Sequence, residues 1–150
     1  MLQRQQTIWW FLIGAFALLM LPFDWMTLFV ADGGDYTLSA AGIVKDATTV
    51  IPGTALTVYL IVMALFNFVI IGLYKKRILQ ARLSIISIIM SIGTYGLVAL
   101  YRYMSFTAEV TDSNFNWPLV LPLISAILGV MAVRHVLLDE AKVRSLDRLR

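Results

Sequence analysis

Five polar residues inside long apolar stretches are the first candidates for chemistry. Asn67 is the one strongly polar residue within the apolar run 54–74. The run 83–103 contains the other four, at successive spacings of 3, 4 and 3, which are Ser84, Ser87, Ser91 and Thr94. That spacing places the four hydroxyl groups on one face of a helix. We predict that all five form hydrogen bonds between packed helices; the alternative is that they line a polar path or contact a substrate.

The chain contains few side chains suited to catalysis. The chain has no cysteine, which excludes disulfides and thiolate sites, and its one histidine, His135, lacks the further ligands that a metal site needs. No phosphate-binding loop or nucleophile elbow is present. We therefore predict a protein that is not an enzyme and binds no cofactor and no metal. The alternative, a membrane enzyme, would need Asp24, Glu109 and Asp112 to converge in one pocket.

The elements that position these residues are indicated by the composition. Hydrophobic residues make up 60% of the 150 residues and charged residues 14%, against about 25% charged in soluble domains. Mean hydropathy is +0.83. An apolar run at 8–23 follows Arg4, and we interpret it as an uncleaved membrane helix, not as a signal peptide, because no small-x-small cleavage motif follows it.

Four apolar stretches predict an all-α membrane protein, an antiparallel bundle of four transmembrane helices. About 20 residues are needed to cross a hydrocarbon core of about 30 Å. The expected helices are about 6–23, 54–74, 82–103 and 118–138. We predict that residues 1–150 form a single membrane domain. Its remaining parts are the outer loops 24–53 and 104–117, the inner loop 75–81 and the cytoplasmic tail 139–150.

The first outer loop is long enough to have structure of its own. Residues 25–30 and 36–39 are rich in strand-forming types, and Gly33-Gly34 between them favours a tight turn. We predict a small extracytoplasmic β-hairpin here, with an irregular loop as the alternative. Residues 43–44 or 48–50 are candidates for a third strand, and 106–110 for another.

Basic residues orient the chain. Ten lie on the predicted inner side: Arg4, Lys75, Lys76, Arg77, Arg82, Arg134, Lys142, Arg144, Arg148 and Arg150. Only Lys45 and Arg102 lie outside. This bias predicts a multi-pass membrane protein with both termini cytoplasmic. The net charge of +3 combines +7 inside with −4 outside, so it is not a single basic face for nucleic acid.

Two basic segments are candidate surfaces for lipids or a partner. The inner segment contributes Lys75, Lys76, Arg77 and Arg82, and the tail contributes Arg144, Asp147, Arg148 and Arg150. Arginine and lysine at a membrane surface attract anionic headgroups. The tail is interpreted either as an interfacial anchor or as a docking segment for another protein.

The two ends of the chain carry a resemblance to a known family. The chain opens on MLQRQQT, residues 1–7, and closes on DEAKVRSLDRLR, residues 139–150. These segments resemble the ends of a family of small four-helix membrane proteins from Bacteroidota, a domain of unknown function numbered 4293. The resemblance implies an inner-membrane protein without an assigned activity, and it supplies no catalytic residues.

The functional prediction is a non-catalytic scaffold or accessory subunit of a membrane protein complex. Its expected partners are membrane lipids and another membrane protein or complex, with no nucleic acid; a homo-oligomer is compatible with the sequence. The alternative is a small transporter or lipid-handling protein that acts as an oligomer. Pumps usually need ionisable residues within the membrane, and the predicted helices contain none between their ends.

Overall fold

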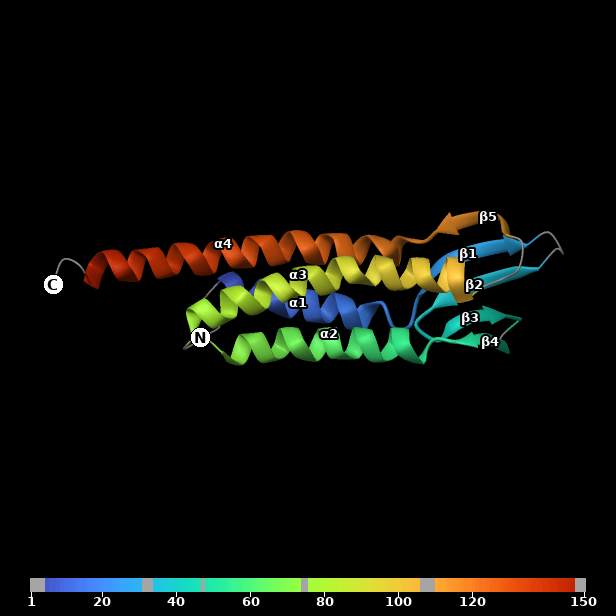
Figure 1. The fold of residues 1–150 in the computed structure, drawn as a ribbon, viewed down its shortest axis with the longest axis horizontal. Coiled ribbons are helices and arrows are strands. Elements are labelled where there is room, and N and C mark those ends of the chain that lie inside the picture. The colour runs from blue at the N-terminus through green and yellow to red at the C-terminus, as the bar shows by residue number, and fades with distance from the viewer. Residues whose placement is uncertain (1–4, 31–33, 47, 74–75, 106–109, 148–150) are drawn as a thin grey trace.

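The computed structural model describes residues 5–30, 34–46, 48–73, 76–105 and 110–147. Four helices run alongside one another, and a sheet caps one end of them (Figure 1). The start of α1 and the end of α4 lie at the opposite end from the sheet (Figure 1). The molecule therefore has a helical part and a sheet end.

The helices follow the apolar stretches of the sequence. They are α1 (Gln5–Leu19), α2 (Thr54–Gly72), α3 (Arg77–Leu100) and α4 (Leu121–Asp147). A π-helix, η1 (Tyr101–Ser105), continues α3, and a 3₁₀ turn, η2 (Trp117–Val120), precedes α4. Pro118 lies at the start of η2, where a missing N–H is tolerated.

Three helices are long and apolar enough to cross a membrane: Thr54–Gly72, Ile78–Tyr103 and Trp117–Asp139. The first helix differs from the predicted span 6–23, because α1 ends at Leu19. Its 15 residues extend about 22 Å, less than a hydrocarbon core of about 30 Å. Pro22 explains the early end, since proline disfavours helix in the residue before it. Of the four predicted membrane spans, three therefore have the required length and composition in the described part, and α1 is too short.

Five antiparallel strands form one sheet in the order β4-β3-β2-β1-β5. Their bounds are β1 (Asp24–Val30), β2 (Asp35–Ser39), β3 (Gly42–Lys45), β4 (Thr48–Pro52) and β5 (Val110–Phe115). Ser39 pairs with Gly42, so Ala40 and Ala41 form a two-residue turn. Gly42 has a φ of +110°, a conformation that favours glycine.

The predicted all-α class is wrong, since the protein combines four helices with a five-stranded sheet and is mixed α/β. The expected hairpin corresponds to β1 and β2, but the sheet is larger because both outer loops contribute to it. The second loop supplies β5, which pairs with β1 at 110–115, whereas the prediction placed a strand at 106–110. Residues 106–109 lie outside the described part. The polar sequence of β5 gave a weak strand signal, and its pairing with β1 stabilises it.

One apolar core joins the sheet to the helix ends. Trp25, Leu28 and Ile43 from the strands belong to the same buried cluster as Leu60 and Tyr101 from the helical part. A second cluster, which includes Trp10, Met63 and Val136, fills the bundle further from the sheet. The sheet is therefore packed onto the helices as part of the same folded unit, and its position relative to them is fixed.

Candidate functional site

The polar face within the bundle links α2 to α3. The Ser87 hydroxyl donates to Asn67 Oδ1 over 2.7 Å, and Asn67 Nδ2 donates to the carbonyl of Met63 over 2.8 Å. Both side chains are buried. An amide in an apolar interior needs such partners, because an unpaired polar group is costly there. The pair therefore serves helix contact in this structure.

The remaining predicted hydroxyls are also buried and hydrogen-bonded. Trp10 Nε1 donates to Ser84 Oγ over 2.8 Å, which joins α1 to α3. The hydroxyls of Ser91 and Thr94 donate to backbone carbonyls one turn earlier in α3. None of these residues lines the cavity at the junction of the sheet with α3 and α4.

Sequence reasoning missed Gln80, which is 1% exposed. Its Nε2 donates to the carbonyl of Ile70 over 2.9 Å, and its backbone carbonyl accepts a hydrogen bond from Ser84 Oγ over 2.8 Å. The prediction placed Gln80 in the inner loop because basic residues surround it. A signal was present in the spacing: Gln80 precedes Ser84 by four residues and extends the same helical face.

The basic candidates lie at the end of the molecule away from the sheet. Lys76 immediately precedes α3, Arg82 follows within it, and both side chains are exposed. Arg77 falls within α3, and Arg144 and Asp147 within α4. Three predicted residues, Lys75, Arg148 and Arg150, lie outside the described part. The helix α4 continues past its predicted end at residue 138 to Asp147, so most of the tail is helical.

The outer carboxylates do not converge. Asp24 begins β1, while Asp112 on β5 pairs with Phe29 at the far end of β1. Five residues of strand between these positions correspond to about 16 Å. Asp112 Oδ1 accepts a hydrogen bond from the backbone N–H of Ser113 over 2.7 Å. Glu109 lies outside the described residues. Because Asp24 and Asp112 lie so far apart along β1, these two carboxylates do not share the pocket that the enzyme alternative requires.

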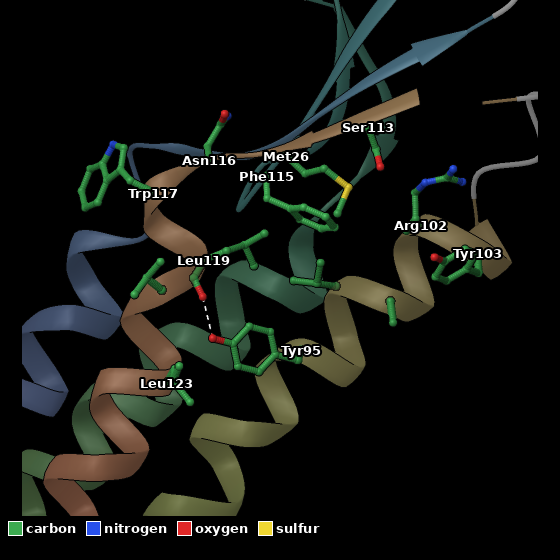
Figure 2. A pocket seen from close by; sticks show the side chains of 13 residues that line it. Met26, Tyr95, Arg102, Tyr103, Ser113, Phe115, Asn116, Trp117, Leu119 and Leu123 are labelled. Carbon is green, nitrogen blue, oxygen red and sulfur yellow. Dashed lines mark hydrogen bonds between the residues drawn. The ribbon is translucent and has the colours of Figure 1, made fainter. Parts of the chain in front are cut away.

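A groove of about 480 Å³ lies where the sheet meets α3 and α4. Figure 2 shows the side chains that line it, from β1, β5, α3, η1, η2 and α4. They are Met26, Tyr95, Val98, Ala99, Arg102, Tyr103, Ser113, Phe115, Asn116, Trp117, Leu119, Val120 and Leu123. The Tyr95 hydroxyl donates to the carbonyl of Leu119 over 2.6 Å and ties the two walls together (Figure 2). We call this site the outer groove.

The outer groove was not predicted, because its residues come from four separate parts of the chain. Phe115 and Trp117 come from the second outer loop, Met26 from the first, Tyr95 from the third predicted helix and Leu123 from the fourth. The pairing of β5 with β1 and the packing of α3 against α4 bring them together. The aromatic character of Tyr103, Phe115 and Trp117 was the one signal available, and it is shared with ordinary interfacial residues.

Comparison with protein families gives a match over most of the chain. No curated protein matches the sequence. A family model described as a domain of unknown function, DUF4293, matches residues 2–149. The match includes most of both terminal segments on which the resemblance was based, and it confirms the resemblance to this domain of unknown function. Because the match extends over nearly the whole chain, this protein belongs to the family described as Domain of unknown function (DUF4293).

Proposed function

We propose that the protein is a non-catalytic scaffold or accessory subunit of a membrane protein complex in the bacterial inner membrane. The supporting observation is the apolar core shared by the sheet and the helix ends. Because Trp25 and Leu28 pack with Leu60 and Tyr101, the sheet surface is held at a fixed position relative to the membrane helices. A rigid unit whose two ends are held in fixed positions suits a protein that supports a complex.

Charge supports an orientation with both termini in the cytoplasm. Lys76 and Arg82 lie at the end away from the sheet, and the basic tail follows from α4 at that same end (Figure 1). Lys45 and Arg102 are the two basic residues near the sheet. Basic residues are retained on the cytoplasmic side, which puts the sheet outside.

The end of α4 is the surface proposed for the partner. This helix extends beyond the other three at the end away from the sheet (Figure 1). In the proposed orientation, this projecting end of α4 lies in the cytoplasm, where it can meet a cytoplasmic protein or the cytoplasmic part of a membrane protein.

Removal of residues 143–150 is expected to abolish recovery of a partner without preventing membrane insertion. The test is purification of the full chain in mild detergent, followed by mass spectrometry of the accompanying proteins. A matched control carries residues 143–150 in reversed order, which keeps their composition and charge. Lipid anchoring by charge would survive this reversal, whereas specific docking is lost. The proposal fails if both tail variants recover the same companion as the unmodified chain, or if that chain is always recovered alone.

A further inference from the structure

The outer groove opens toward the part of the molecule that lies against lipid. Several of its lining side chains are largely exposed, including Tyr103 at 77%, Phe115 at 71% and Leu123 at 54%. Leu123 lies within the apolar span Trp117–Asp139, and Tyr103 is the last residue of the span Ile78–Tyr103. Aromatic residues at the ends of spans mark the interface between hydrocarbon and headgroups. The outer groove therefore extends from the hydrocarbon to the headgroup level.

The walls of the outer groove suit an acyl chain. Met26, Val98 and Leu119 supply apolar side chains, and the volume of about 480 Å³ falls in the usual range for small-molecule sites, about 300–1,000 Å³. The two polar groups there, the Tyr95 hydroxyl and the Leu119 carbonyl, are hydrogen-bonded to each other. An acyl chain in contact with them therefore leaves neither group without a hydrogen-bond partner.

One end of the outer groove carries a positive charge. Among the described residues of the lining, Arg102 is the only formally charged one, and Figure 2 shows it toward the end opposite Leu123. Its guanidinium lies 5.2 Å from the centroid of the Tyr103 ring. It forms no ion pair with another described residue. Guanidinium matches the geometry of phosphate and binds it through two hydrogen bonds.

The π-helix η1 determines how this charge is presented. Tyr101 is buried, and its hydroxyl donates to the carbonyl of Pro52 over 3.2 Å, which fixes η1 against the end of β4. The next two residues, Arg102 and Tyr103, are then directed to the outer groove. A π-helix has poorer geometry than an α-helix and occurs frequently at functional sites.

We propose that the outer groove binds one anionic phospholipid from the outer leaflet of the membrane. One acyl chain lies between α3 and α4 against Leu119 and Leu123, and the phosphate bonds to Arg102. This site goes beyond the proposed scaffold role and does not depend on it, because partner docking was assigned to the tail of α4.

Native mass spectrometry of the full chain tests the proposal. The protein is reconstituted in vesicles of phosphatidylglycerol and phosphatidylcholine and extracted in mild detergent, and the retained lipids are counted. The unmodified chain is expected to retain one phosphatidylglycerol. Ala99→Phe fills the outer groove and is expected to lower retention of either lipid by about tenfold. Arg102→Gln is expected to keep a lipid but to lose a preference for phosphatidylglycerol of about tenfold.

The matched control is Lys45→Gln, which removes the other outer cation. Lys45 lies over the Tyr36 ring, 5.0 Å from its centroid, and does not line the outer groove. This variant is expected to retain lipid as the unmodified chain does. Equal losses from Lys45→Gln and Arg102→Gln would overturn the proposal, as would unchanged retention in Ala99→Phe.

A second measurement on the unmodified chain does not depend on how well the variants fold. Phosphatidylglycerol with a photoreactive group on its acyl chain is expected to label the peptide that contains Val120 and Leu123. Labelling confined to α1 and α2, or a polypeptide segment found in the outer groove instead of lipid, would overturn the proposal. Recovery of a partner through the tail would be unaffected in either case, so failure of the lipid site is distinguishable from failure of the scaffold role.

Discussion

Gly42→Ala is expected to destabilise the protein by more than about 3 kcal/mol. Gly42 has a φ of +110°, and a Cβ added there would lie 1.9 Å from the carbonyl oxygen of Ile51. That atom belongs to the backbone of β4, so relief requires the β3–β4 pair to separate. The free energy of unfolding in detergent micelles measures the loss, and far-UV circular dichroism reports the strands.

Gly96→Ala is the matched control for this substitution. A Cβ added at Gly96 in α3 would meet nothing within 4 Å. Alanine also favours helix over glycine by about 1 kcal/mol. The control is therefore expected to be neutral or slightly more stable than the unmodified chain. If Gly42→Ala were as stable as Gly96→Ala, the described β2–β3 turn would be incorrect.

Trp25→Ala is expected to cost about 3–5 kcal/mol, the usual range for removal of a buried aromatic side chain. Trp25 is 0% exposed in the core that joins the sheet to the helices. Its Nε1 donates to the carbonyl of Met20 over 2.8 Å, so the substitution also leaves that carbonyl without this partner. Because Met20 follows α1 and Trp25 lies in β1, the substitution is expected to weaken the contact between the helical part and the sheet. Denaturant unfolding followed by tryptophan fluorescence measures it.

Trp117→Ala provides the comparison, since Trp117 is 53% exposed. It packs against Phe23, with ring centroids 4.8 Å apart, and little else encloses it on its outer side. We expect less than half the loss found for Trp25→Ala, because the cavity left behind is open and costs little. Similar losses for both tryptophans would contradict the position of Trp25 in the shared core.

The helical part of the fold follows from the sequence to a large extent. Apolar runs of bilayer length gave α2, α3 and α4, and the spacing of Ser84, Ser87, Ser91 and Thr94 gave the buried face of α3. These properties are local, because a helix forms all its backbone hydrogen bonds within one segment. The strands β1 and β2 were also predicted for a local reason, because strand-forming residues flank Gly33-Gly34, and residues 43–44 or 48–50 were candidates for a third strand. Both of these segments form strands, β3 and β4.

The sheet and the outer groove depend on contacts between distant segments. The strand β5 is polar at most positions and pairs with β1, more than eighty positions earlier in the chain. Periodicity within one segment carries no information about such a partner. The same holds for the hydrogen bond from Trp10 to Ser84. The sequence placed each residue in a helix but did not indicate that the two side chains bond to each other. The burial of Gln80 was not predicted, because the basic residues around it indicated a loop, although its spacing of four residues from Ser84 places it on the buried face of α3.

Cysteine labelling tests the central claim, that the sheet lies outside the membrane and the α2–α3 connection lies in the cytoplasm. The chain has no cysteine, so Thr49→Cys on β4 and Arg82→Cys on α3 each introduce a single exposed site. A membrane-impermeant maleimide is added to spheroplasts before and after permeabilisation. We expect Thr49→Cys to react at once and Arg82→Cys to react only after permeabilisation. The reverse order, or immediate reaction of both, would contradict the claim.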